Sequence, residues 1–248
     1  MLTDTEGIVL RQTKTSYGRR MILLFSSKYG KISAGTSIGE KRKTRAALAL
    51  RPFTYGRYEL FKNRDSYNIN GADVLNSHYK IGEDVDKYLN GAYVLEFTER
   101  VLPEEESSPG IFALLKDFLD LLETRDRGIG TLVLAYQVKL LKYSGVMPIL
   151  DRCVVCGGKK PPAKLSVEDG GMICAECAES MENLRRDTLI YDVGFGIVDI
   201  LEYFMTNPLK RLENIALKED VGKLLQKIIR EYAAYYLDVA DLKSEKLI

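Results

Sequence analysis

The sequence predicts an α+β multidomain protein in which a small N-terminal β-barrel is followed by an α-helical domain carrying an inserted cysteine module. Three observations support this prediction. Over the first 80 residues, hydrophobic residues recur with a period of two, and from about residue 81 the period is near 3.6. All four cysteines lie within the helical part, between residues 153 and 177. The 248 residues suffice for one large domain or two or three small ones.

The N-terminal domain, residues 1–80, is predicted to contain five short strands separated by turn-like segments such as TSYG and SSKYGK. The strand segments are EGIVLRQTK, RRMILLFSS, ISAGTS, RPFTYGRYELFK and SYNINGADVLNS. In the fourth segment, Tyr58 and Leu60 alternate with Arg57, Glu59 and Phe61, so the two sets should face opposite sides of the strand. Five short strands in about 75 residues fit a small barrel.

The helical domain, residues 81–248, is predicted from hydrophobic residues at helical spacing. The helical segments are DKYLNGAYVLEFTERVL, IFALLKDFLDLLETR, TLVLAYQVKLLKYSG, VGFGIVDILEYFMT and DVGKLLQKIIREYAAYYLDV. The loop after the first of them holds the acidic run Glu104-Glu105-Glu106, and Ser107 or Ser108 is a candidate cap for the next helix. We interpret the acidic run as a solvated loop, with a carboxylate metal cluster as the alternative.

The cysteines form the pattern C-x2-C-x17-C-x2-C, and they are Cys153, Cys156, Cys174 and Cys177. This spacing is typical of a tetrahedral zinc site, and we expect the module to span residues 150–183. Gly157 permits a tight turn after the first pair, and a hairpin turning at Asp169-Gly170-Gly171 would bring the two pairs together. Four thiolates close the coordination shell, which favours one structural zinc per chain. Iron, or four buried thiols without a metal, are the alternatives.

Charge is distributed unevenly along the chain. Residues 1–80 carry 15 Lys and Arg against 6 Asp and Glu, whereas residues 81–248 carry 21 against 29. We therefore expect the barrel to contact a polyanion, because cations with interleaved aromatic rings suit single-stranded nucleic acid. The candidate DNA-binding residues are Arg19, Arg20, Lys41, Arg42, Lys43, Arg45 and Arg51, and the candidate stacking residues are Tyr17, Tyr29, Tyr55 and Tyr58. Alternatively, the cations form a solvated loop and the tyrosines fill the core.

Residue types that carry catalysis are few. His78 is the only histidine, and the chain has neither a phosphate-binding loop nor a dinucleotide fingerprint. We therefore expect a binding protein and not an enzyme. No hydrophobic run reaches the roughly 18 residues of a membrane helix, and the N-terminus does not resemble a signal peptide. These features predict a cytoplasmic protein without membrane contact, whose thiols stay reduced.

Several segments, taken in order, resemble one bacterial family. EGIVLRQTKTSYGRRMILLFSSKYGKIS and ALALRPFTYGRYEL are similar to strands of the DNA repair and recombination mediator family RecO. LAYQVKLLKYSGVMPILDRCVVCG and DGGMICAEC are similar to its two cysteine knuckles, and DLKSEKLI to its closing residues. The resemblance covers nearly the whole chain.

The resemblance implies an OB-fold at the N-terminus and a zinc module held by the four cysteines. It also implies binding to single- and double-stranded DNA and annealing of complementary strands. With RecR, such a protein helps RecA displace single-strand-binding protein, whose acidic C-terminal tail binds the helical domain. Lys139 and Lys142 are candidate cations for that tail. The implied location is the nucleoid, and DNA binding carries over to residues 41–51 as a region.

Two other functions fit the same residues. A zinc-ribbon interaction protein would use the barrel to bind protein and not DNA. A metal-dependent nuclease would use the scattered carboxylates. A gel shift with single-stranded DNA tests the first alternative, and incubation of labelled DNA with magnesium tests the second.

Overall fold

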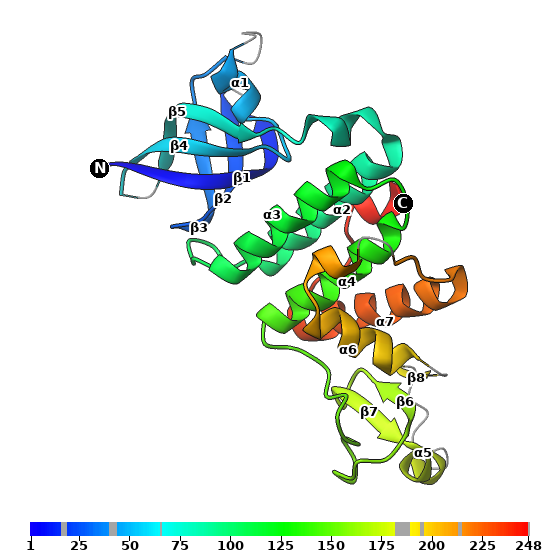
Figure 1. The fold of residues 1–248 in the computed structure, drawn as a ribbon. Helices are drawn as coiled ribbons and strands as arrows, with labels where there is room; N and C mark the ends of the chain where they lie inside the picture. The colour runs from blue at the N-terminus through cyan, green and yellow to red at the C-terminus, as the bar shows by residue number, and fades with distance from the viewer. Residues whose placement is uncertain are drawn as a thin grey trace. The chain divides into compact units, whose positions relative to one another are not determined.

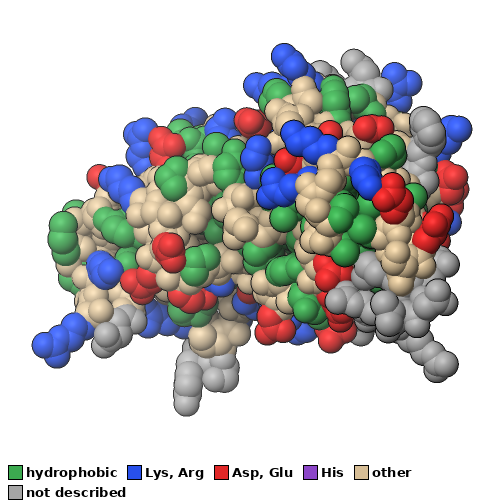
Figure 2. Space-filling view, turned by 90° about the horizontal axis from the view of Figure 1, so that it is seen from below, with side chains coloured by type: hydrophobic (Ala, Val, Ile, Leu, Met, Phe, Trp, Pro, Cys, Tyr) green, Lys and Arg blue, Asp and Glu red, His purple; other side chains and the backbone are tan. Residues whose placement is uncertain are grey.

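The computed structural model describes residues 1–15, 19–39, 44–64, 66–181, 189–193, 196–212 and 215–247 (Figure 1). The chain divides into two compact units, one formed by Met1–Ile129 with Leu242–Ile248 and the other by Gly130–Asp241. Within the described ranges, no helix has both the length and the hydrophobicity needed to span a bilayer. Charged side chains of both signs are interspersed on the face shown in Figure 2, with hydrophobic side chains in groups between them.

The barrel of the first unit closes in the strand order β1-β2-β3-β5-β4. Its strands are β1 Leu2–Lys14, β2 Arg20–Ser26, β3 Gly30–Thr36, β4 Tyr55–Lys62 and β5 Tyr67–Asn76. Neighbouring strands are antiparallel except β3 and β5, which pair in parallel. β1 closes the barrel because it pairs with β2 along its second half and with β4 along its first half. This five-stranded closed sheet confirms the predicted OB-like barrel.

A short helix, α1 Arg45–Ala49, connects β3 to β4 and was not predicted. The Thr44 side chain caps it by accepting a hydrogen bond from the Ala47 N–H at 3.2 Å. Five residues are too few for a hydrophobic period to show, so α1 depends on contacts with the barrel.

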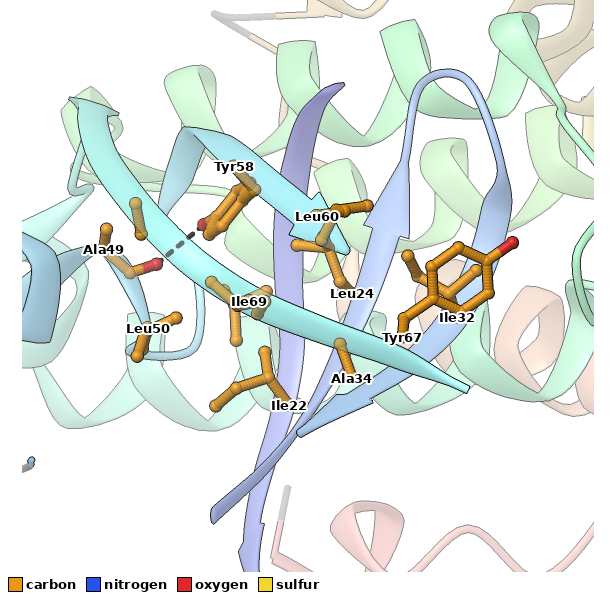
Figure 3. Packing of buried hydrophobic residues seen from close by; sticks show 12 residues of the cluster. Ile22, Leu24, Ile32, Ala34, Ala49, Leu50, Tyr58, Leu60, Tyr67 and Ile69 are labelled. Atoms are coloured by element: carbon orange, nitrogen blue, oxygen red, sulfur yellow. Dashed lines mark hydrogen bonds between the residues drawn. The ribbon is translucent and has the colours of Figure 1, made fainter. Parts of the chain in front are cut away.

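Alternating side chains of the strands fill one hydrophobic core (Figure 3). Tyr58 and Leu60 of β4 are fully buried, while Arg57, Glu59 and Phe61 are exposed, as the period of two predicts. The buried Tyr58 hydroxyl donates a hydrogen bond at 2.7 Å to the Ala49 carbonyl, drawn as a dashed line in Figure 3. This bond satisfies a polar group in the core and ties the end of α1 to the barrel.

The first unit also contains helices outside the barrel. They are the 3-10 helices η1 Tyr79–Glu83 and η3 Ser244–Leu247 and the α-helices α2 Val85–Val101 and α3 Pro109–Thr124. Phe112 of α3 meets Phe25 of β2 edge-on, with ring centroids 5.4 Å apart. Ser108 occupies the N-cap position of α3, but its side chain makes no capping hydrogen bond.

His78 is buried between β5 and η1. Its Nδ1 lies 2.8 Å from the Phe53 carbonyl oxygen, and its Nε2 lies 2.9 Å from Asp120 Oδ1 of α3. Burial raises the pKa of Asp120, but hydrogen bonds from His78 and Lys116 outweigh burial and lower it. These contacts give His78 a structural position within the first unit.

The second unit contains helices and a small antiparallel sheet. The helices are α4 Ile129–Tyr143, α5 Ala175–Met181, α6 Ile197–Thr206, η2 Leu209–Leu212 and α7 Glu219–Leu237. The sheet has the order β7-β6-β8, with β6 Pro162–Ser166, β7 Gly171–Cys174 and β8 Ile190–Asp192. β6 and β7 form the predicted hairpin, whereas β8 and α5 were not predicted. The Tyr236 hydroxyl of α7 donates to the Val167 carbonyl at 2.9 Å, which fixes the hairpin to α7.

Candidate metal centre and nucleic-acid interface

The four cysteines gather at one point of the second unit. The Sγ atoms of Cys153, Cys156, Cys174 and Cys177 all lie within 4.8 Å of one another. The Sγ atoms of Cys156 and Cys174 are 3.9 Å apart. Thiolates bound tetrahedrally to one zinc ion, each at about 2.3 Å, would be roughly 3.8 Å apart. The cluster therefore fits a single four-coordinate metal ion, and no other such cluster of metal-ligating side chains occurs among the described residues.

Local turns aim backbone N–H groups at the sulfurs. Gly157 has φ +71°, and its N–H donates to the Cys153 carbonyl at 2.8 Å. The second pair begins at the last residue of β7, where the Cys174 N–H points at Cys153 Sγ at 3.4 Å. This is the knuckle geometry expected from glycine after the first pair, because a side chain disfavours positive φ.

Backbone N–H groups around Cys153 favour the ionised form of its thiol. Burial raises the pKa of Cys153, but backbone N–H groups of Cys156, Cys174 and Val155 outweigh burial and lower it from 9.0 to about 6. A hydrogen bond with the Cys174 thiol, with burial, raises the pKa of Cys177 to about 12. A bound cation favours thiolates at all four positions, so metal binding would release the remaining protons.

Charged side chains beside the cluster are paired with one another. Lys160 Nζ lies 2.5 Å from Glu176 Oε2, which links the two cysteine pairs across the module. Arg152 lies 3.5 Å from Asp151. A hydrogen bond to Glu176 is the main cause that raises the pKa of Lys160, with smaller contributions from Cys174 and Cys156. Lys160 therefore helps to balance the negative charge of the thiolates.

The expected DNA-binding cations fall into three groups. Arg19, Arg45 and Arg51 are exposed. Lys41, Arg42 and Lys43 lie outside the described residues. Arg20 is buried, and its guanidinium donates to the Ile38 carbonyl at 2.9 Å and to Gln12 Oε1 at 2.7 Å. Arg20 therefore connects β2 to β1 and to the segment after β3.

Arg19 lies across the outside of the barrel. Its guanidinium donates to the Asn68 side chain of β5. A Cβ added to Gly35 of β3 would lie 2.6 Å from Arg19 Nη2, so the absence of a side chain at Gly35 makes room for the guanidinium. Arg19 thus presents its charge beside β3 and β5.

Of the candidate stacking tyrosines that the structure describes, Tyr58 is buried and Tyr29 and Tyr55 are half-buried. Tyr58 is in the core, Tyr55 donates to Glu6, and the Tyr29 hydroxyl lies 2.8 Å from Thr3 Oγ1. Tyr17 lies outside the described residues. Phe61 was not among the stacking candidates, although this residue is 40% exposed on the outer face of β4. Its exposure was predictable from the sequence, because the period of two places Phe61 on the same face of the strand as Arg57 and Glu59.

Family models and known proteins are similar to this chain over nearly its whole length. A family model described as "Recombination protein O N terminal" matches residues 1–78, and "Recombination protein O C terminal" matches residues 82–246. The DNA repair protein RecO of Alkaliphilus metalliredigens is 29% identical over 98% of this chain and 97% of its own length. Proteins of the same name from Caldanaerobacter subterraneus and Oceanobacillus iheyensis are each 28% identical. They cover 97% and 95% of this chain, and 95% and 89% of their own lengths.

Proposed function

This chain belongs to the recombination protein O family of DNA repair proteins, and from this premise we propose that it binds single- and double-stranded DNA and anneals complementary strands without covalent chemistry. The observation that carries the proposal is the closed β1-β2-β3-β5-β4 barrel with exposed arginines. Barrels of this type bind oligonucleotides with the β2–β3 face and the adjoining loops. We assign DNA binding to the domain of residues 1–80.

The proposed mechanism is electrostatic. Cations of the barrel neutralise phosphates, which releases counterions and reduces the repulsion between two strands held by the protein. On the face shown in Figure 2, acidic side chains lie among the Lys and Arg side chains of the described residues. Contacts with DNA would therefore come from local groups of cations, such as Arg19, Arg45 and Arg51 of the barrel. The basic segment of residues 41–43 would add to them.

Binding of a labelled oligonucleotide at several salt concentrations tests this mechanism. If about four phosphates are neutralised, the logarithm of the affinity for single strands should fall with the logarithm of salt with a slope near −3. Changing Lys41, Arg42, Lys43 and Arg45 together to Glu should abolish most of the binding and annealing. A control that changes Lys210, Arg211, Lys218 and Lys223 of the second unit to Glu alters the net charge equally. The proposal would be contradicted if both variants lost the same amount of DNA affinity, or if the affinity of wild type did not change with salt concentration.

We propose that the four cysteines hold one zinc ion per chain in a structural site within the module of residues 150–183. The mutual distances of the four sulfurs support this, since four thiolates leave no open position for a catalytic water. Iron accepts the same ligands, so the test is elemental analysis of the purified protein. One zinc per chain is expected, and an iron absorption spectrum would contradict the assignment.

We further propose that the chain acts with RecR to load RecA onto DNA coated with single-strand-binding protein, at the nucleoid in the cytoplasm. The helical domain of residues 81–248 would receive the acidic tail of single-strand-binding protein. Of the two expected cations, Lys139 is mostly buried, and Lys142 is exposed although its Nζ donates to the Met205 carbonyl at 3.1 Å. Lys142 is thus the better placed, and Lys142→Glu should weaken binding of a tail peptide.

A further inference from the structure

The segment between α2 and α3, residues 102–108, folds back onto the barrel of the same unit. The Glu105 N–H donates to the Lys31 carbonyl at 3.0 Å. Gly30 has φ +68°, and a Cβ added there would lie 2.0 Å from the Glu106 carbonyl oxygen. This close approach of the loop to the barrel therefore requires a residue without a side chain at position 30. The acidic run therefore has a defined position on the barrel and is not only a solvated loop.

The Glu105 carboxylate lies against two hydrogen-bond donors of the barrel. Its Oε2 is 3.4 Å from Lys62 Nζ and 3.3 Å from the Tyr67 hydroxyl oxygen. Lys62 Nζ also lies 4.8 Å from the centre of the Tyr67 ring. Because Lys62 ends β4 and Tyr67 begins β5, the two donors flank the β4–β5 loop, which also carries the exposed Arg64.

The backbone of Glu105 is in a conformation that suits glycine. Its φ is +55°, in the left-handed region that side chains disfavour. Strained conformations of this kind are concentrated at functional sites. Here the strained residue is Glu105, whose side chain contacts Lys62 and Tyr67. The strain therefore points to a functional role for this carboxylate.

We infer that Lys62 and Tyr67 form a phosphate subsite on the barrel and that the Glu105 carboxylate occupies this subsite until a DNA phosphate displaces it. A carboxylate and a phosphodiester both carry a single negative charge, and both accept hydrogen bonds from ammonium and hydroxyl groups. The β4–β5 loop is one of the two loops that border the ligand face of an OB-fold. The inference rests on the proposed function, DNA binding by this barrel.

The ion pair between Lys62 and Glu105 is exposed, whereas the Tyr67 side chain is almost fully buried. The side chains of Lys62 and Glu105 are 41% and 54% exposed, and such pairs contribute little to stability. A hydrogen bond with the Tyr67 hydroxyl, followed by that with Glu105, raises the pKa of Lys62, so its ammonium group is charged at neutral pH. Glu105 acts as a weak competitor that lowers the affinity for DNA.

The neighbouring glutamates differ from Glu105. Glu104 lies 3.2 Å from Lys31, a mostly buried lysine that also donates to the Glu99 carbonyl at 2.8 Å, so this pair is structural. Glu106 is exposed and makes no ion pair with any residue in the described ranges. Glu106 is therefore a matched control, because it has the same charge in the same loop without the contact.

The experiment compares Glu105→Gln with Glu106→Gln, since each change removes one negative charge and preserves the shape of the side chain. Binding of a labelled oligothymidylate is followed by fluorescence anisotropy at about 50 mM salt, where charge effects are weakly screened. Glu105→Gln is expected to bind about threefold more tightly than wild type, in line with the strength of exposed ion pairs. Glu106→Gln should bind like wild type. If the two variants have equal affinities, the subsite is wrong.

A double-mutant cycle with Lys62→Gln separates a direct contact from a long-range charge effect. Lys62→Gln alone should weaken binding about two- to threefold, and adding Glu105→Gln should then change little, because the two residues act on the same phosphate. An undiminished gain from Glu105→Gln without Lys62 would overturn the inference. Thermal melts of each variant would check that the barrel is folded.

The wild-type titration separates this inference from the proposed function. If wild type shows no salt-dependent binding of the oligonucleotide, the proposed function fails and the subsite fails with it. If wild type binds and Glu105→Gln behaves like Glu106→Gln, the subsite alone fails.

Discussion

The barrel and the cysteine module reach stable structures in different ways. The barrel buries a continuous core that includes Leu24, Tyr58 and Leu60, none of which has exposed area. The buried cluster of the cysteine module consists of Cys153, Ile173, Cys174 and Ala178, so half of it is cysteine. A core that small cannot offset the entropy of an ordered chain without a cross-link. From this comparison we expect hydrophobic burial to be the main source of stability in the barrel, and a metal held by the cysteines to be the main source in the module.

The largest expected effect follows from removing one of the candidate metal ligands. Cys174→Ser should abolish metal binding and unfold the module, because metal binding contributes about 10 kcal/mol or more to folding in small zinc domains. Proteolysis should then cleave the chain near residues 153–177, while the oligonucleotide affinity of the barrel stays close to that of wild type. Metal content, protease fragments and anisotropy measure the three outcomes. Loss of DNA binding with the fold intact would mean that the module contacts DNA.

A core substitution in the barrel should show the opposite pattern. Leu60→Ala should lower the free energy of unfolding of the barrel by about 2–5 kcal/mol, because it leaves a cavity in the core. Phe61→Ala, one residue further on the exposed face, should cost less than about 1 kcal/mol. Urea denaturation measures both, and metal content should be normal in both. Similar costs for the two changes would contradict the alternation in β4.

Arg19 and Arg20 are adjacent at the start of β2, and we expect one to affect DNA binding and the other to affect stability. Arg20→Ala should destabilise the barrel by about 1–3 kcal/mol, since Gln12 and the Ile38 carbonyl lose a charged donor. Arg19→Ala should leave stability within about 0.5 kcal/mol of wild type but weaken oligonucleotide binding. Thermal melts and anisotropy on both variants measure the two effects. The assignment of roles is wrong if the effects are exchanged.

The smallest effect concerns pH and the first unit. Burial raises the pKa of Glu96, but hydrogen bonds from Ser244 and Lys243 outweigh burial and lower it below its ordinary value of 4.5. The stability contributed by this carboxylate is therefore fully present above pH 4.5 and is lost as the pH falls through the lowered value. Glu96→Gln should lower the free energy of unfolding at neutral pH. Below pH 4.5, this free energy should fall less steeply with decreasing pH in the variant than in wild type. Thermal melts of wild type and Glu96→Gln at several pH values measure the difference, and equal acid dependence in the two proteins would contradict this assignment.

Secondary-structure patterns were predictable where they were long or periodic. The alternation of Tyr58 and Leu60 with exposed neighbours placed β4 correctly, and glycine signals placed the β6–β7 hairpin. The elements that sequence reasoning missed are short. α1 is tied to the barrel by the Tyr58–Ala49 hydrogen bond, and β8 exists through its pairing with β6. Tertiary contacts define such elements, so no local pattern reports them.

The sequence by itself determined the barrel class, the family and the four cysteines, because strand period and ligand spacing are local properties of the chain. Only the tertiary structure decided that Arg20 is buried beside an exposed Arg19, and that Glu105 lies on Lys62 and Tyr67. These outcomes depend on contacts between residues far apart along the chain. The charge and type of a residue do not reveal which other residues its side chain will contact in the folded protein.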